Sequence, residues 1–261
     1  MLLDRFKLTD RVAVVTGAGR GIGRGIALAY AEAGAHVVCA ARSREQIEET
    51  AEGVRDFGRR ALAAPCDVLE RSQLEALVQA TLDEFGRIDV LVNNAGGWPP
   101  KPALRTSEKD FEAAFRFNVT SAFLLTRFTV PHLARSGEGA VVNVSSAAGR
   151  LAQPGFAAYG TAKAALSFLT RNLAAEFAPK VRVNAIAVGS VETSALGTIL
   201  TDELRRKMED ATPMGRIGSV EDIACCALYL ASPAAGWVTG KVFEVDGGTE
   251  ATNFRMPVAD L

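Results

Sequence analysis

The chain has 261 residues, of which 48% are hydrophobic and 23% are charged, as in a globular protein with a sizeable core. Its 29 basic and 30 acidic side chains give a net charge of −1, which argues against a nucleic acid or an acidic membrane as partner. Apolar runs are too short for a transmembrane helix, and the first residues mix charged with apolar side chains, unlike a secretory signal, so we expect a cytoplasmic protein. The four cysteines and two histidines lack the spacing of a zinc site, so we expect no metal.

The first half of the chain alternates between apolar runs typical of buried strands and segments with helical periodicity. Gly34 and Gly86 suit the ends of two of the helices. The pattern predicts strands at 11–16, 36–41, 61–68 and 88–93, with helices at 22–33, 43–57 and 70–85.

The second half continues this alternation, apart from a less regular stretch at 190–218. Ser219 and Asp222 have the spacing of a capping box for a helix that ends near 231. The other expected elements are helices at 107–135 and 158–177 and strands at 140–145, 181–188 and 242–245.

Strands that are apolar on both faces and alternate with helices indicate a parallel sheet covered on each side. The expected fold is therefore α/β: one doubly wound, Rossmann-type domain over 1–261, with a seven-stranded parallel sheet and helices on both faces. Ligands of such sheets bind beyond the carboxyl ends of the strands, so the residues that directly follow each strand are the candidates for a site.

A glycine-rich segment, TGAGRGIG at 16–23, follows the first expected strand. Glycines allow a sharp turn and a close approach to a pyrophosphate, and the next helix presents free N–H groups. The alternative, a turn with spare glycines, explains four glycines in seven residues poorly. The residues expected to contact a dinucleotide here are Gly17, Gly19, Arg20, Gly21, Ile22 and Gly23.

Two further candidate segments follow the third and fourth strands. Asp67, next to Val68, is placed to accept a hydrogen bond from an adenine amino group, or is simply an acid at a helix N-terminus. Asn94, Ala95 and Gly96 are small enough for the cofactor to lie against them, or form a turn that an asparagine caps.

The end of the second strand carries no carboxylate, which NAD-selective proteins of this fold use to bind the adenosine ribose. Ala41 occupies that position and is followed by Arg42 and Ser43, while Arg20 approaches from the glycine loop. Two guanidinium groups and a hydroxyl suit a 2′-phosphate, so we expect NADP(H) rather than NAD(H). The alternative is that both arginines are solvated surface charges.

Tyr159 and Lys163 are four residues apart, which places both side chains on one face of the expected helix. A lysine ammonium beside a tyrosine stabilises the phenolate and lowers the tyrosine pKa, making it a better acid or base near neutral pH. Ser146 ends the fifth strand and can hydrogen-bond a reacting oxygen. Ser145 is its rival, but alternation sends the two side chains to opposite faces. A surface tyrosine and lysine are the alternative interpretation of the pair.

Taken together, TGAGRGIG, NNAG, Asn118, Ser146 with YGTAK, and NAIAVGSVET resemble the short-chain dehydrogenase/reductase family over nearly the whole chain. The resemblance implies that Ser146 orients the substrate oxygen, that Tyr159 is the acid/base, and that Lys163 holds the nicotinamide ribose. It also implies that Asn118 kinks its helix and holds a water that links Lys163 to solvent.

The resemblance further assigns the turn after the sixth strand to the nicotinamide carboxamide, through Gly189, Val191 and Thr193. One departure weakens this assignment: the family has a proline where this chain has Val188.

Several segments resemble bacterial 7-alpha-hydroxysteroid dehydrogenases, and two of these also recur in 3-oxoacyl-carrier-protein reductases. A bulky apolar carbonyl such as a hydroxysteroid is therefore the expected substrate, and a 3-oxoacyl thioester is the alternative. The region 190–211 is expected to form a lid over the substrate. The pocket candidates, each of which is also explained by ordinary loop packing, are Trp98, Leu151, Phe156, Leu196 and Ile199.

Two further expectations concern activity and assembly. A protein that senses NADP(H) without catalysis is an alternative in a different class, but it has no need of all four residues Asn118, Ser146, Tyr159 and Lys163. The family resemblance implies a homotetramer, or at least a dimer, through the long helices, with a face of small residues at 158, 162 and 165.

Overall fold

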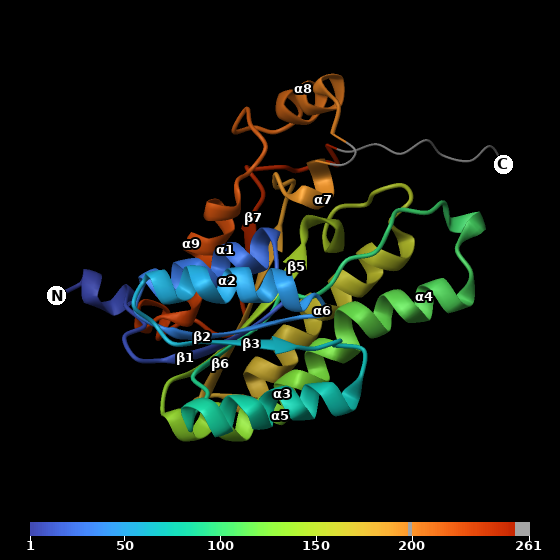
Figure 1. Cartoon of the computed structure of the whole chain (residues 1–261). Helices are drawn as coiled ribbons and strands as arrows, with labels where there is room; N and C mark the ends of the chain where they lie inside the picture. The colour runs from blue at the N-terminus through green and yellow to red at the C-terminus, as the bar shows by residue number, and fades with distance from the viewer. Residues whose placement is uncertain (198–199, 254–261) are drawn as a thin grey trace.

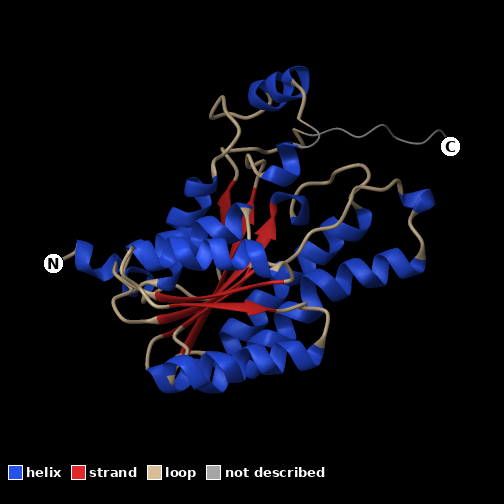
Figure 2. Cartoon of the chain, viewed as in Figure 1, coloured by secondary structure: helices blue, strands red, loops and turns tan. Residues whose placement is uncertain are grey.

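The structure is a computed structural model of the chain and describes residues 1–197 and 200–253. Seven parallel strands form its sheet, in the order β3-β2-β1-β4-β5-β6-β7 (Figure 2). The strands are β1 (Val12–Thr16), β2 (His36–Ala41), β3 (Ala61–Pro65), β4 (Val90–Asn93), β5 (Gly139–Ser146), β6 (Val181–Val188) and β7 (Val242–Val245).

Helices cover both faces of this sheet (Figure 1). The α-helices are α1 (Gly21–Glu32), α2 (Arg44–Asp56), α3 (Arg71–Phe85), α4 (Glu108–Phe115), α5 (Ser121–Ser136), α6 (Ala157–Phe177), α7 (Ser194–Gly197), α8 (Asp202–Asp210) and α9 (Val220–Ala231). A π-helical segment, η3 (Arg116–Thr120), joins α4 to α5, and short 3₁₀ turns are η1 (Leu3–Phe6), η2 (Ala103–Arg105), η4 (Ala147–Gly149) and η5 (Pro233–Ala235).

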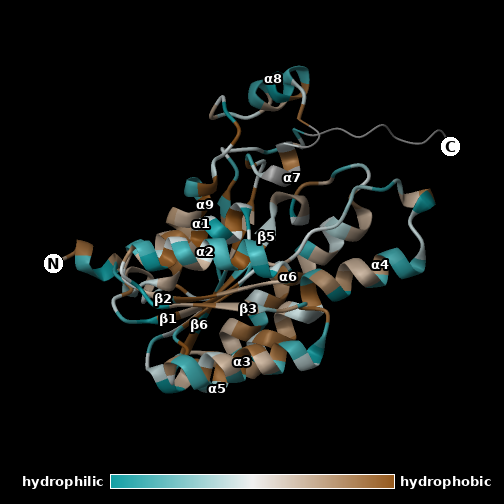
Figure 3. Cartoon of the chain, viewed as in Figure 1, coloured by the Kyte–Doolittle hydropathy of each residue, from teal (hydrophilic) through white to brown (hydrophobic). Residues whose placement is uncertain are grey.

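The strand side chains divide the core into two layers because successive residues point to opposite faces. Val15 packs in the layer with α1, α2 and α9, whereas its neighbour Val14 packs in the layer with α3, α5 and α6. The hydropathy colouring follows this arrangement, with brown strands inside the molecule and teal stretches on the surrounding helices (Figure 3). The strand order reverses between β1 and β4, and the cavities described below lie at the carboxyl edge there.

The fold prediction is confirmed, including the seven parallel strands and the capping box of Ser219 and Asp222 that begins α9. One local prediction differs. The third strand ends at Pro65 instead of Val68, because a turn follows in which Asp67 accepts a hydrogen bond from the Leu69 amide at 3.0 Å. The expected long helix is interrupted by η3, which contains Asn118, and the less regular stretch contains α7 and the charged helix α8.

Two observations bear on partners. Over 1–197 and 200–253, no helix combines the length and hydrophobicity needed to cross a bilayer. Within those same ranges, no group of His, Cys, Asp and Glu side chains is arranged to hold a metal ion.

Candidate active site

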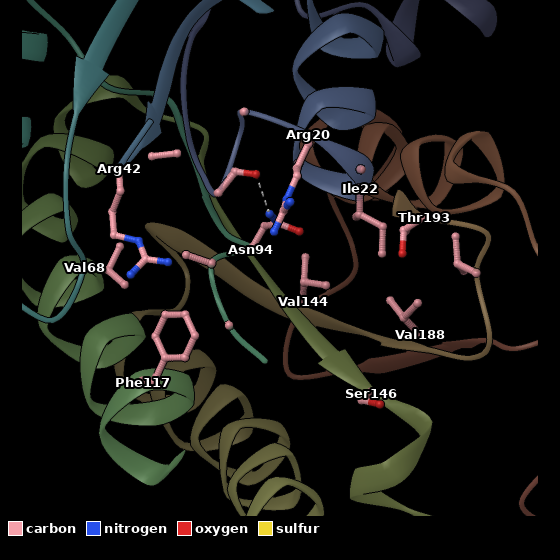
Figure 4. Close-up of a pocket in the computed structure, with 18 of the residues that line it drawn as sticks. Arg20, Ile22, Arg42, Val68, Asn94, Phe117, Val144, Ser146, Val188 and Thr193 are labelled. Atoms are coloured by element: carbon pink, nitrogen blue, oxygen red, sulfur yellow. Dashed lines mark hydrogen bonds between the residues drawn. The ribbon is translucent and has the colours of Figure 1, made fainter. Parts of the chain in front are cut away.

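A cavity of about 590 Å³ opens at the carboxyl edge of the sheet, above the first turn of α1 (Figure 4). Its lining includes every residue that the sequence analysis assigned to the cofactor, from Gly17 in the glycine loop to Thr193 after β6. The lining also includes four residues that the sequence analysis did not assign to the site, namely Gln46, Cys66, Phe117 and Val144. Gln46 lies in the first turn of α2. Phe117 directly precedes Asn118, and its place next to a motif asparagine was the signal that could have identified it.

The glycine loop is packed so closely that side chains cannot be added. A Cβ on Gly23 would lie 2.2 Å from the Gly17 carbonyl oxygen, and Gly17 itself has a φ of +65°. Arg20, the residue that precedes α1, makes no side-chain capping bond, so the first N–H groups of the helix stay available. The loop therefore fits a dinucleotide pyrophosphate at a helix N-terminus.

Asn94 fixes the floor of this cavity. Its side-chain amide donates to the Thr16 carbonyl at 2.8 Å, while its own N–H and that of Ala95 donate to the Thr16 hydroxyl at 3.0 Å. These bonds join the end of β4 to the start of the glycine loop. The asparagine therefore stabilises the shape of the cavity.

Arg20 and Arg42 are exposed, and both side chains reach into the cavity from different elements (Figure 4). Arg42 follows β2, where Ala41 also lines the cavity and places no carboxylate beside it. Ser43 caps α2 by accepting from the Gln46 amide at 3.5 Å. The region where an adenosine ribose would lie is thus positively charged.

Tyr159 and Lys163 lie on one face of α6, beside Ser146 at the end of β5. The Ser146 hydroxyl is hydrogen-bonded to the Tyr159 hydroxyl. The Lys163 ammonium donates to the Val144 carbonyl at 2.8 Å and lies 5.7 Å from the centre of the tyrosine ring. The hydroxyl groups of Ser146 and Tyr159 thus lie side by side in the lining of the cavity.

Burial governs the protonation of this group. It raises the pKa of Tyr159, and the hydrogen bond from Ser146 lowers it only in part. Burial also lowers the pKa of Lys163 to about 8. Burial therefore sets the direction of the Tyr159 pKa in the chain alone, and the expectation that Lys163 lowers this pKa stays a prediction.

Ser145 and Ser146 have separate roles, as the alternation predicts. The buried Ser145 hydroxyl donates to the Lys163 carbonyl at 3.0 Å and shares a hydrogen bond of 2.8 Å with Ser167. Its bonds hold β5 against α6. Ser146, unlike Ser145, lines both cavities.

Asn118 lies within the π-helical segment, where the helix departs from regular α geometry. Its amide donates to the Ala114 carbonyl at 2.9 Å, and its oxygen accepts from the Gly97 amide at 2.9 Å. Gly96 lies between Asn118 and Lys163, because a Cβ there would be 2.7 Å from the asparagine oxygen and 3.1 Å from the lysine nitrogen. Asn118 thus positions the segment that follows β4, and its expected water relay stays a prediction.

The turn after β6 is held by backbone contacts of Gly189 and Val191. A Cβ on Gly189 would lie 2.5 Å from the Asp246 Cα, so this position requires glycine. The Gly189 amide donates to the Val245 carbonyl at 3.0 Å, and Val191 forms a bridge with Gly218. These contacts hold the turn in this structure, and the effect of Val188 in place of the family proline stays a prediction.

A second cavity, of about 270 Å³, adjoins the first and shares Ser146 and Tyr159 with it. Of the predicted pocket residues, Leu151, Phe156 and Leu196 line it. Trp98, on the segment that follows β4, does not line this cavity. Ile199 lies outside the described residues.

The lining also contains residues that the sequence analysis missed. These come from distant parts of the chain and include Pro100, Gln153, Met208, Thr249, Thr252 and Asn253. None of the described lining residues carries a charged side chain. The cavity thus suits an uncharged, largely apolar molecule that presents one oxygen to Ser146 and Tyr159.

The strand order, the glycine loop and the Ser146, Tyr159 and Lys163 group are those of a dinucleotide-dependent oxidoreductase. The chain belongs to the short-chain dehydrogenase/reductase family. The matching family model, described as enoyl-(acyl carrier protein) reductase, covers residues 17–250.

Particular relatives cover almost the whole chain. An uncharacterized oxidoreductase of Mycobacterium tuberculosis is 51% identical, with 100% of both chains covered. The 7α-hydroxysteroid dehydrogenase of Escherichia coli is 38% identical over 94% of this chain and 96% of its own length. A solved 7α-hydroxysteroid dehydrogenase, complexed with NADH and 7-oxo glycochenodeoxycholic acid, has a TM-score of 0.91 at 38% identity and covers 95% of this chain and 97% of that one. The chain is thus an oxidoreductase of alcohol and ketone groups that binds a nicotinamide dinucleotide.

Proposed function

We propose that the protein interconverts a secondary alcohol and a ketone on a bulky, apolar, uncharged substrate such as a hydroxysteroid, with NADP(H) as cofactor. The observation that carries this proposal is the uncharged cavity of about 270 Å³ that ends on the Ser146 and Tyr159 hydroxyls. The steroid nucleus of the 7-oxo glycochenodeoxycholic acid in the similar solved dehydrogenase supports a steroid ketone, although that acid also carries a carboxylate, for which the described lining of this cavity offers no cationic partner.

The choice of NADP(H) rests on charge. Arg20 and Arg42 line the cofactor cavity together with Ala41, where a selective NAD enzyme would carry a carboxylate. Each charge-assisted bond to a 2′-phosphate is worth about 1.5–3 kcal/mol, less where solvent screens it. We therefore expect kcat/KM to favour NADP(H) over NAD(H) by roughly 10- to 1000-fold. The similar solved dehydrogenase holds NADH, so the cofactor preference proposed for this chain differs from the cofactor bound there.

The side chains divide the work of ketone reduction. Bound NADPH supplies the hydride to the carbonyl carbon. Burial keeps Tyr159 protonated at neutral pH, so its hydroxyl donates a proton to the carbonyl oxygen. Ser146 donates a hydrogen bond to the same oxygen, and Lys163, which is charged below about pH 8, stabilises the tyrosinate that remains.

We also propose that residues 190–211 act as a lid. Leu196 on α7 and Met208 on α8 both line the substrate cavity, and these two helices lie beyond the carboxyl edge of the sheet (Figure 1). Closing them over the substrate would exclude water from Tyr159.

A homotetramer remains our proposal for assembly, but on a different face from the one expected. Ala158 and Ala162 are buried within the chain, and Ala162 packs with Val119, Ala122 and Leu166 of the chain itself. The exposed apolar side chains of α4, α5 and α6 are instead large, with Phe168 61% exposed, and this aromatic face supports self-association.

The test is a panel of steroid ketones, 3-oxoacyl thioesters, quinones and small diketones, assayed with NADPH and with NADH. We expect reduction of steroid ketones with NADPH at the highest kcat/KM. Faster turnover of thioesters would replace the substrate class, and equal or better use of NADH would overturn the cofactor assignment. NADPH binding without turnover of any compound would favour the sensing alternative.

A further inference from the structure

One side of the substrate cavity is formed by the end of the described chain. Thr249, Thr252 and Asn253 line the cavity and belong to residues 247–253, which we call the C-terminal wall. The wall follows β7 and contains neither helix nor strand. Its position relative to Ser146 and Tyr159 therefore depends on individual contacts, namely the backbone bond from the Met214 amide to the Gly247 carbonyl at 3.1 Å and several side-chain contacts.

Arg150 makes the largest set of these contacts. Its guanidinium donates to the Thr249 carbonyl at 2.7 Å and pairs with Asp246 at 2.9 Å, Glu250 at 3.1 Å and Glu244 at 3.2 Å. The side chain of Asp246 is only 5% exposed, whereas that of Glu250 is 84% exposed. The pair with Asp246 is the one that matters, because exposed pairs are weak and a buried carboxylate without its partner is costly.

The base of Arg150 is fixed to the catalytic residues. It directly follows η4, the turn that begins after Ser146, and its amide donates to the Ala147 carbonyl at 2.9 Å. A Cβ on Gly149 would lie 2.8 Å from the Lys163 carbonyl carbon, so this turn packs directly on α6. Arg150 thus joins the C-terminal wall to the elements that carry Ser146 and Tyr159.

The wall is held at its far end as well. Asn253 accepts from the Ser190 hydroxyl at 2.9 Å and donates to the Thr212 hydroxyl at 3.1 Å. Near its start, the Gly248 amide donates to the Asp246 carboxylate at 3.0 Å. With both ends held, a change at Arg150 frees the part that contains Thr249.

We propose that Arg150 is a positioning residue, which sets the affinity for substrate by fixing the C-terminal wall. The inference rests on the proposed function of the 270 Å³ cavity. The described linings of both cavities exclude Arg150 itself, so it acts through Thr249 and its neighbours. Its loss should therefore raise KM for a bulky ketone at least tenfold, while kcat and the Kd of NADPH stay within about threefold.

Arg150→Gln is compared with Arg87→Gln in the full chain, in the presence of NADPH. Arg87 is a matched control because it also pairs with a buried carboxylate, donating to Asp89 at 2.8 and 2.6 Å beside the first residue of β4, at the opposite edge of the sheet. Hydrogen exchange of peptides that cover 247–253 is measured together with KM, kcat and NADPH binding. We expect the exchange rate of the wall to rise at least tenfold in Arg150→Gln and to stay unchanged in Arg87→Gln. Arg150→Lys should give a rate between those of the wild type and Arg150→Gln.

Equal exchange of the wall in the two glutamine variants would mean general destabilisation and would overturn the proposal. Faster exchange with an unchanged KM would also overturn it, since the wall would then not determine affinity. A wild-type protein that reduces no ketone in the panel defeats the proposed function, and the exchange comparison alone then decides whether Arg150 fastens the wall.

Discussion

The two adjoining cavities are built in different ways. The cofactor cavity is lined by strand ends and first helical turns, and its shape depends on backbone contacts such as that between Gly23 and the Gly17 carbonyl. The substrate cavity combines Leu196 from α7, Met208 from α8 and Thr249 from the C-terminal wall, which lie far apart in the chain. Backbone geometry thus dictates the first cavity, and the packing of loops dictates the second. Changes in the first should have large effects that are similar for all substrates, whereas changes in the second should be smaller and depend on the substrate.

The largest effect is expected where the two cavities meet. Tyr159→Phe removes the hydroxyl that donates the proton and should lower kcat by ~10² to 10⁴, with the Kd of NADPH within a few-fold. Steady-state kinetics and fluorescence titration measure both quantities, with Tyr229→Phe as the control. Retention of more than about half the activity would remove Tyr159 from its role.

Within the cofactor cavity, Gly23→Ala should be the most damaging change. The new Cβ would lie 2.2 Å from the Gly17 carbonyl oxygen, and relieving such a contact costs roughly 1–3 kcal/mol. We expect NADPH affinity to fall by up to ~100-fold for every substrate tested. Gly86→Asn is the control, since nothing lies within 4 Å of its Cβ position and Asn tolerates its left-handed φ of +74°. Unchanged affinity in Gly23→Ala would contradict the tight packing of the loop.

Arg42→Ala tests the charge of the same cavity. It should reduce the preference for NADPH over NADH by one to two decades and leave NADH kinetics nearly unchanged, because only the 2′-phosphate loses a partner. Adding Ala41→Asp should reverse the preference by repelling that phosphate. Arg44→Ala, at the start of α2, should leave the preference for NADPH over NADH unchanged. A preference that persists in Arg42→Ala would leave this arginine a bystander.

The pH dependence of NADPH binding should follow Lys163. Burial lowers its pKa to about 8, so the ammonium is present below that pH and lost above it, whereas an unburied lysine keeps its charge to about pH 10.4. We expect the Kd of NADPH to rise about threefold to tenfold between pH 7 and 9.5. Tyr159→Phe should show the same curve, because it retains Lys163. A flat titration to pH 10 would contradict the lowered pKa.

The smallest effect is expected in the substrate cavity. Leu196→Ala removes one apolar wall contributed by α7 and should raise KM about threefold to tenfold for a steroid ketone, but not for a small diketone. Leu104→Ala removes a leucine that is 72% exposed and should change neither value. Equal loss for both substrates would show that the packing of α7 does not select for size.

The same contrast explains what the sequence predicted. The strand pattern predicted the seven parallel strands, and motif positions identified the residues that line the cofactor cavity, because a strand end fixes where the next residues lie. Trp98 was assigned to the substrate cavity from its apolar character alone, but it does not line that cavity. Nothing in the local sequence places Thr249 or Asn253 beside Tyr159, since their positions depend on contacts with Arg150 and Ser190.

The chemistry of the tyrosine pKa was also beyond the sequence. Spacing alone placed Lys163 on the face of Tyr159, but the extent of burial decides the direction of the pKa, and burial is a property of the assembled core. The assembly face depends on the assembled core for a similar reason. Of the small residues expected at 158, 162 and 165, Ala158 and Ala162 are buried within the chain and Ala165 is partly buried, and the assembly itself stays a prediction.

Lys163 is bonded to β5 at both of its ends. Its ammonium donates to the Val144 carbonyl, and its own carbonyl accepts from Ser145, the next residue of the same strand. Replacing this lysine in a chain that binds cofactor without catalysis would remove the hydrogen bond to the Val144 carbonyl, a loss of folding stability that adds to the loss of chemistry. Selection for a folded chain therefore helps to retain a catalytic side chain even during periods when its activity is not needed.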